Sequence, residues 1–377
     1  MGASSDNGTT SGPPAHARRA IGVWLLIVAA LVVVMIVVGG LTRLTHSGLS
    51  ITEWEPVMGV IPPLSGADWS EAFAKYQQVP EYKALNPGLT LPEFKQMYWW
   101  EWTHRFIGRV AGVVFLIPFL IFLWRRWIAG KLAIWLGIVF LLGAAQGALG
   151  WWMVESGLAG RTDVSQYRLA AHLGLAFLLF GALFWTALDV SRTPDVRVGT
   201  AFGLLRATHE GDDRARGAAR RAWLWSALFL LIVFKQIILG ALVAGTDAGF
   251  TNNDWPLMNG QLVPDGLFDI SPWWLNFFEN VTTIQFQHRL GGYIVGLAAL
   301  ALWISNERSG IRALKGPGRH VFGVAMLQIV LGVWTLMSAV PVTLAAAHQL
   351  MAVALFAAAL YHLHVARSVS KTGRAAT

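Results

Sequence analysis

Four polar side chains stand at the start of an apolar run and carry the clearest chemical signal in the chain. They lie in the segment YWWEWTHRFIGRV, residues 98–110, as Glu101, His104, Arg105 and Arg109. Polar and charged groups are costly inside a membrane, so they usually mark function there. A helix would place Glu101 and His104 on one face. The segment therefore predicts a functional site at the end of a helix.

The composition indicates a membrane protein. Of 377 residues, 55% are hydrophobic and only 13% are charged, whereas soluble domains are about a quarter charged. The formal charge of +8 does not indicate nucleic-acid binding, because basic residues in membrane proteins gather in cytoplasmic loops. The chain has no cysteine, which excludes disulfides, Cys-ligated zinc and iron–sulfur clusters.

Eight apolar segments are long enough to cross a bilayer as helices. They are predicted at about 20–41, 104–124, 131–152, 169–189, 222–244, 285–305, 320–340 and 343–364. The sequence thus predicts an all-α integral membrane protein. Residues 1–19, rich in Gly, Ser, Thr and Pro, are predicted to form a disordered tail. Residues 190–221 are predicted to be a linker and 366–377 a second tail.

Lysine and arginine alternate between crowded and sparse loops. The crowded segments are residues 18–19, 125–131, 190–221, 308–319 and 367–374. Basic loops face the cytoplasm, so both termini and the linker are expected on that side. The opposite loops, 44–103, 153–168, 245–284 and 341–342, then face outward. Residues 98–110 consequently lie at the outer end of the second span.

The first four spans recur as the last four. EWTHRFIGRVAGVVF (101–115) matches QFQHRLGGYIVGLAA (285–299), and GGLTRLTHSGLSITEW (39–54) matches GALVAGTDAGFTNNDW (240–255). LLGAAQGALGWWM followed by LAAHLGLAFLLF parallels MLQIVLGVWTLM followed by LAAAHQLMAVALF. An even number of spans gives both copies the same orientation. We therefore expect two parallel-repeat four-helix bundles, a first half over 20–189 and a second half over 222–365.

Four of the ten histidines occupy matching repeat positions, and the other six fall in polar segments, loops or helix ends. His104 matches His288, and His172 matches His348. Each lies near the outer start of an even-numbered span, so the pairs reach the same depth. Two imidazoles facing each other across a helical bundle suit one metalloporphyrin. Copper or zinc is the main chemical alternative, and packing is the alternative for a single histidine.

Arginine follows the matched histidines directly, as Arg105 and Arg289. These side chains could reach outward to lipid headgroups, or they could pair with the carboxylates of a porphyrin. Arg109 matches Tyr293 and so belongs to the first half alone.

Glu101 is the main asymmetry between the halves. Its repeat partner is Gln285, which cannot ionise. One site therefore has a carboxylate at its edge and the other does not. This difference predicts a reactive first half and an electron-transfer second half. The alternative for Glu101 is an interfacial ion pair with Arg105 or a loop lysine.

The pieces GGLTRLTHSGLSITEWEPVMGVIPPL, PEY, EFK and EWTHRFIGR resemble the haem A synthase family, in its cysteine-free alphaproteobacterial and mitochondrial branch. The resemblance covers about residues 20–365. It implies an oxidoreductase that oxidises the C8 methyl of haem O to a formyl group, giving haem A for cytochrome oxidase. It also implies that His104, His172 and catalytic Glu101 surround the substrate haem. His288 and His348 would bind haem b as the cofactor.

The same resemblance implies a setting and a chemical role. The setting is a bacterial inner membrane with haem sites toward the periplasmic side. Implied partners are haem O synthase, cytochrome oxidase assembly factors and an electron donor. Glu101 would accept a proton or stabilise positive charge at the methyl carbon. Because two histidines fill the axial positions, either one ligand dissociates or electron removal precedes attack by water.

Two other functions fit parts of the pattern. A di-haem b cytochrome would pass electrons to a partner, but a transmembrane relay needs haems at both depths, and these four histidines lie near one face. A transporter would also contain repeats. Continuous spans and paired histidines argue against it.

Overall fold

The computed structural model describes residues 13–55, 58–191 and 213–372, and within these ranges it is built almost entirely of helix. Eight of its helices are long and apolar enough to span a membrane, which confirms the predicted number. They are α1 (Ala15–Leu44), α4 (Leu91–Trp124), α5 (Gly130–Leu158), α6 (Gln166–Ser191), α7 (Asp213–Gly245), α9 (Val281–Arg308), α10 (Arg312–Met337) and α11 (Val342–Thr372). The protein is therefore a multi-pass membrane protein of the all-α class.

Several helices extend past the apolar windows that predicted them. α1 begins at Ala15, inside the predicted tail 1–19, and α7 begins at Asp213, inside the predicted linker 190–221. Arginine and lysine are good helix formers, so a helix continues past its apolar span into basic sequence. Residues 1–12, 192–212 and 373–377 of the predicted tails and linker lie outside the described residues.

α4 also begins early, and its start has a clear local cause. Thr90 and Glu93 form a capping box in which the Glu93 carboxylate accepts from the Thr90 N–H at 2.8 Å. Pro92 occupies the first turn, where its missing N–H costs nothing. The segment that contains Glu101 and His104 is thus part of one continuous helix that enters the membrane region from the α1–α4 loop.

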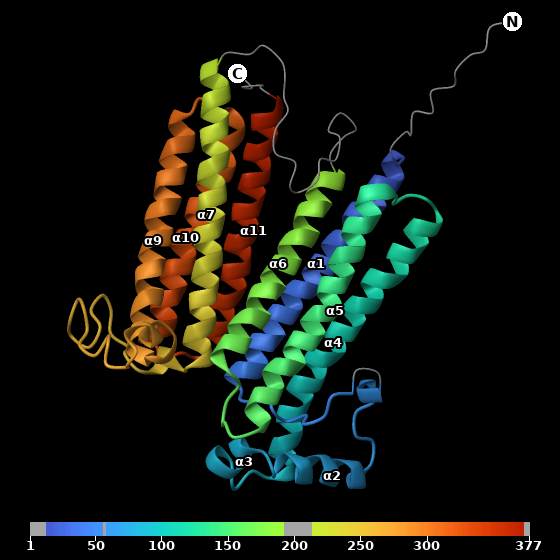
Figure 1. Ribbon diagram of the computed structural model, residues 1–377, viewed down its shortest axis with the longest axis vertical. Helices are drawn as coiled ribbons and strands as arrows, with labels where there is room; N and C mark the ends of the chain where they lie inside the picture. The colour runs from blue at the N-terminus through green and yellow to red at the C-terminus, as the bar shows by residue number, and fades with distance from the viewer. Residues whose placement is uncertain (1–12, 56–57, 192–212, 373–377) are drawn as a thin grey trace, which may run out of the picture.

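The long helices form two groups (Figure 1). In the first, α1 packs against α4 and α6, and α5 packs against α4 and α6. In the second, α7 and α10 each pack against α9 and α11. The groups meet where α6 contacts α7 and α11, and where α1 contacts α11. The rings of Phe177 and Phe356 pack edge to face across this junction. That the groups are copies of one repeat remains a prediction.

Many apolar side chains lie on the outside of the helices. Leu141, Leu231 and Leu297 are each more than 60% exposed. In water such a surface would aggregate, whereas in a bilayer it contacts lipid chains. The outer faces of both groups therefore fit a hydrocarbon environment.

The two longest loops lie at the same end of the bundle (Figure 1). The α1–α4 loop contains η1 (Met58–Val60), α2 (Gly66–Tyr76) and α3 (Pro80–Leu85), and an aromatic cluster that includes Trp69, Tyr76 and Phe94 packs it onto α4. The α7–α9 loop contains η2 (Ala248–Phe250), η3 (Trp273–Leu275) and α8 (Asn276–Glu279). The start of α1 and the end of α11 lie at the opposite end.

Candidate functional site

Glu101 is buried, with 3% of its surface exposed, where α4 meets the α1–α4 loop. Its Oε2 accepts from the Ser50 hydroxyl at 2.7 Å and from the Ile51 N–H at 2.8 Å. Its Oε1 accepts from Arg105 Nη2 at 2.6 Å, one helical turn further along α4. Three donors thus fix the orientation of one carboxylate. The ion pair with Arg105 that the sequence offered as an alternative is present.

Arg105 joins the helix to the loop as well as to Glu101. Its guanidinium donates to the carbonyls of Ile51 and Glu53, both at 2.9 Å. These two carbonyls and the Glu101 carboxylate account for the hydrogen bonds of the guanidinium among the described residues. Arg105 therefore fastens the loop onto α4, and its predicted contact with haem propionates remains a prediction.

The second half builds the same junction without a carboxylate. Arg289 donates to the carbonyls of Asn252, Asp254 and Leu257 at 2.6, 2.9 and 2.9 Å. Gln285 stands where Glu101 stands in the first half, and its amide exchanges two hydrogen bonds of 3.0 Å with Asn252. A neutral amide pair thus replaces the charged cluster.

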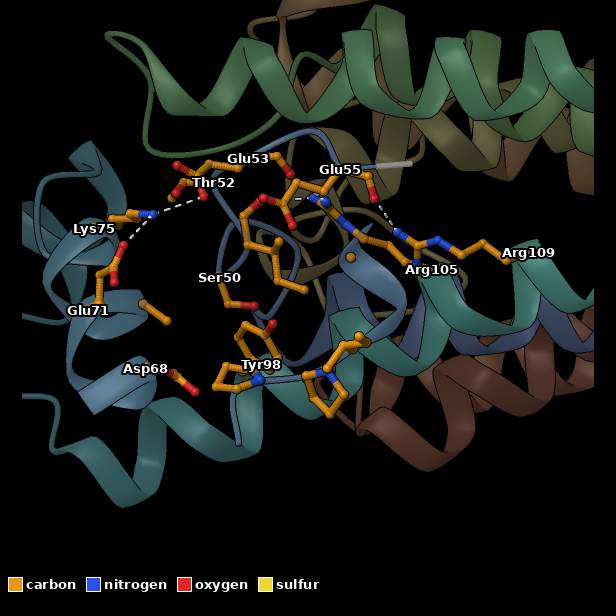
Figure 2. Close-up of a pocket in the computed structure, with 16 residues that line it drawn as sticks. Ser50, Thr52, Glu53, Glu55, Asp68, Glu71, Lys75, Tyr98, Arg105 and Arg109 are labelled. Atoms are coloured by element: carbon orange, nitrogen blue, oxygen red, sulfur yellow. Dashed lines mark hydrogen bonds and ion pairs between the residues drawn. The ribbon is translucent and has the colours of Figure 1, made fainter. Parts of the chain in front are cut away.

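A cavity of about 290 Å³ lies between the α1–α4 loop and α4. Figure 2 shows Arg105 and Arg109 reaching from α4 toward loop residues Glu53 and Glu55, and Arg109 donates to the Glu55 carbonyl at 2.7 Å. Across the cavity, Lys75 pairs with Glu53 and Glu71, each at 3.0 Å. Arg109 therefore lines a polar space next to Arg105, whereas the residue that matches Arg109 in the second half is the uncharged Tyr293.

The two histidines of the first half face neighbouring helices at glycine positions. His104, on α4, lies so close to α1 that a Cβ on Gly39 would stand 2.9 Å from its Nε2. His172, on α6, lies equally close to α5, with a Gly150 Cβ at 2.9 Å from its Cε1. Both rings are partly buried and are close enough to interact electrostatically. The structure therefore brings this predicted pair together.

The second half repeats this arrangement. A Cβ on Gly240 of α7 would stand 3.2 Å from Cε1 of His288, and one on Gly332 of α10 would stand 2.7 Å from Cε1 of His348. These rings are also partly buried and interact electrostatically. Each of the four rings therefore occupies space that a side chain on the facing helix would fill.

A further set of residues, which the sequence pattern did not single out, touches these rings. Each facing glycine is preceded, four positions earlier, by a residue in contact with the same histidine. The four segments are MIVVG (35–39), QGALG (146–150), QIILG (236–240) and QIVLG (328–332). The glutamine amide nitrogens lie 3.2 Å from His172 Nδ1, 3.1 Å from His288 Nδ1 and 3.3 Å from His348 Nε2. The recurring Gln-x-x-x-Gly spacing was the signal that could have revealed them.

The donor set fits a haem. The described residues contain no group of three or more His, Asp or Glu side chains placed to hold a metal ion, so each imidazole pair stands without further protein ligands. Haem iron needs only two axial donors, because the porphyrin supplies the other four. The glycines let a ring lie against the facing helix, as a ligand held between helices requires. His104 with His172, and His288 with His348, are the residues that would hold it.

Two of the remaining histidines have structural partners. His362 is fully buried between Ser226 at 2.9 Å and Asn306 at 2.7 Å, and it ties α11 to α7 and α9. His364 contacts Asp189 of α6 at 2.8 Å. Both lie at the end of the bundle opposite to the paired histidines, and they join helices there.

Eight candidate membrane-spanning helices, with two pairs of partly buried histidines whose donor set suits haem, place the chain in the class of helical membrane proteins. A family model described as cytochrome oxidase assembly protein matches residues 22–360, and the chain belongs to this family. A relative from Parvibaculum lavamentivorans named heme A synthase is 48% identical over 348 residues, which is 92% of this chain and 94% of the relative. Relatives of the same name from Bradyrhizobium diazoefficiens and Nitrosospira multiformis are each 45% identical and cover 93% of this chain. The family resemblance predicted from the sequence is confirmed.

Proposed function

We propose that this protein is a haem A synthase, an oxidoreductase that converts the C8 methyl group of haem O into the formyl group of haem A. The relatives that carry this name match nearly the full chain at 45–48% identity. The observation within the structure that carries the proposal is the pairing of two similar histidine sites with a single carboxylate, Glu101. Gln285 stands in its place in the second half.

The division between the halves follows from that asymmetry. His104 and His172 of the first half would hold haem O as substrate, and His288 and His348 of the second half would hold haem b as cofactor. Bound haem b supplies one-electron chemistry. With the oxygen counted as water, conversion of a methyl to a formyl group releases four electrons and four protons. A haem held by His288 and His348 would supply a route for those electrons.

Glu101 is placed to act on the substrate from the edge of its site. It stands three residues before His104 on the same helix, and its charge is held in one orientation by Ser50, Ile51 and Arg105. A fixed carboxylate lowers the energy of positive charge that develops at the methyl carbon, and it can accept a proton released there. Arg109 lines the adjoining cavity, and its guanidinium would pair with a haem propionate that reached it.

The proposed setting is a bacterial cytoplasmic membrane. The crowded basic segments and the ends of α1 and α11 would face the cytoplasm, and the two long loops with the haem sites would face the periplasm. The first half, 20–189, and the second half, 222–365, would act as two four-helix bundles. Haem O synthase as the source of substrate, and cytochrome oxidase assembly factors as recipients of haem A, fit this role.

Purification followed by haem extraction tests the proposal. The full chain, produced together with a haem O synthase in cells that make no haem A, should contain haem b and should generate haem A. Recovery of haem b alone, with no haem A formed, would favour the alternative of a di-haem b cytochrome. A protein that contains no haem after purification would overturn both functions.

A further inference from the structure

Three glutamines each leave a buried carbonyl oxygen without a hydrogen-bond partner among the described residues. They are Gln146, Gln236 and Gln328, the residues that precede the histidine-facing glycines. A buried polar atom without a partner costs about 1–3 kcal/mol, so such atoms are rare unless they serve a further purpose. That all three belong to one recurring motif points to a shared role.

The glutamine side-chain amide distinguishes three of the histidine sites from the fourth, where Met35 takes the place of glutamine. The backbone at this position interacts with the ring in both kinds of site, because His104 contacts the backbone of Met35 and His348 contacts that of Gln328. Only the glutamines add a side-chain contact. In two of them Nε2 also donates to the histidine's own carbonyl, at 3.0 Å for Gln146 and 2.8 Å for Gln236. The amide therefore holds both the ring and its backbone.

An imidazole that binds iron needs such a partner. When one ring nitrogen takes the metal, the other carries a proton and is usually hydrogen-bonded, which fixes the tautomer and the ring orientation. The Gln236 amide lies 3.1 Å from Nδ1 of His288. A half-turn about its last side-chain bond gives up the bond from Nε2 to the His288 carbonyl and brings the unpartnered Oε1 to Nδ1, where it can accept the proton.

We propose that Gln146, Gln236 and Gln328 are positioning residues that orient three of the four haem-ligating imidazoles. This inference rests on the proposed function. Met35 occupies the fourth place and offers no side-chain amide, so the hydrogen bond of His104 there is to backbone alone. Both histidines that would bind haem b, His288 and His348, are then oriented by a glutamine, as suits a permanent cofactor. Of the two histidines that would bind the substrate haem, only His172 is oriented in this way, as suits a haem that binds and leaves in every cycle.

Opposite substitutions at Gln236 test the second half. An acceptor on the ring proton makes the imidazole a stronger donor and favours ferric iron. In the full-length protein we expect Gln236→Leu to raise the midpoint potential of haem b, to shift its low-spin electron paramagnetic resonance signal and to weaken haem binding about 10–100-fold. Gln236→Glu, a stronger acceptor of similar shape, should lower the potential. A tenfold change in the relative binding of the two iron states corresponds to about 59 mV.

A neighbouring glutamine provides the control. Gln287 precedes His288 directly, but its amide donates to the carbonyl of Phe277 at 2.7 Å and touches no predicted ligand. Gln287→Leu should keep the wild-type haem b signal and potential. Loss of haem b from Gln236→Leu together with retention in Gln236→Glu would also support the proposal. Unchanged spectra and potentials in both Gln236 variants would overturn it.

The converse substitution tests the first half. Met35→Gln introduces the missing amide with a side chain of similar length. It should raise the fraction of haem O or haem A that remains with the purified protein several-fold and slow the release of haem A. Equal retention in the variant and the wild type would refute the role given to Met35. A wild-type protein without haem would instead refute the proposed function, so the two failures are distinguishable.

Discussion

Replacing Glu101 with glutamine removes the charge of the proposed catalytic carboxylate and almost nothing else. The fold should tolerate it, because Gln285 occupies the matching place in the second half beside Arg289. The glutamine keeps one acceptor oxygen, so one or two charge-assisted hydrogen bonds are lost at about 1.5–3 kcal/mol each. Arg105 keeps its two loop carbonyls. We therefore expect a loss of about 1.5–6 kcal/mol in the free energy of unfolding and a protein that still assembles.

The effect on catalysis should be separable from the effect on stability. General-base and electrostatic contributions of one oriented group are worth roughly 10²–10⁴-fold, or about 3–5 kcal/mol in the activation barrier. The rate of haem A formation should fall by this factor in Glu101→Gln, measured by chromatography of extracted haems. The haem b spectrum should stay unchanged, since Glu101 lies in the other half.

The reciprocal variant sharpens the test. Gln285→Glu places a carboxylate beside Arg289 in the second half and should leave haem A formation near the wild-type rate. If Glu101→Gln formed haem A at the wild-type rate, the role of the charge would be refuted. If Glu101→Gln lost its haem b, the substitution would have disturbed both halves, and the assignment of the carboxylate to the first site alone would be wrong.

Two further predictions concern packing and pH. Gly332→Ala would place a Cβ 2.7 Å from Cε1 of His348 and should lower the haem b content. Gly323→Ala, on the same helix but facing open space, should retain haem b. Pyridine haemochrome spectra measure the haem b content of both variants. Burial raises the pKa of Glu81, in the α1–α4 loop, from 4.5 to about 7. The folded state therefore binds the proton more tightly, and stability from this group falls as pH rises from 4.5 to about 7. Above that pH, Glu81→Gln should stabilise the loop by up to about 3 kcal/mol, at about 1.4 kcal/mol per pKa unit. Hydrogen exchange of the loop should show that gain at pH 8 and none at pH 4, and a gain of equal size at both would contradict the reasoning.

The sequence predicted the features that depend on local pattern. Apolar windows located all eight spans, and the matching segments singled out four histidines whose role as ligands stays a prediction. It did not predict the helical starts at Ala15 and Asp213, because basic residues continue a helix without adding to the apolar signal. The Gln-x-x-x-Gly pattern was visible but carried no meaning until the glycines were seen to face imidazole rings.

Contacts between distant segments could not be predicted from the sequence, for a different reason. Ser50 and Ile51 hold Glu101 from about 50 positions away, and only the folded loop shows that the carboxylate has three donors. His362 looked like an interfacial residue at a helix end. Its buried position follows from Ser226 and Asn306, which lie on two other helices. Hydrophobic periodicity assigns a residue to a helix face but does not say which polar side chains a neighbouring helix will present there.

The second half shows that the fold itself does not require a charge at the position of Glu101. Gln285 and Asn252 close the same junction between loop and helix with a neutral pair of hydrogen bonds, and Arg289 anchors the same loop carbonyls there as Arg105 does in the first half. A neutral side chain is therefore sufficient for the architecture. A buried carboxylate carries a desolvation cost that an amide avoids, and the three hydrogen bonds that Glu101 accepts offset that cost. The architecture therefore does not require the charge of Glu101, and we assign that charge to the chemistry of the proposed haem O site.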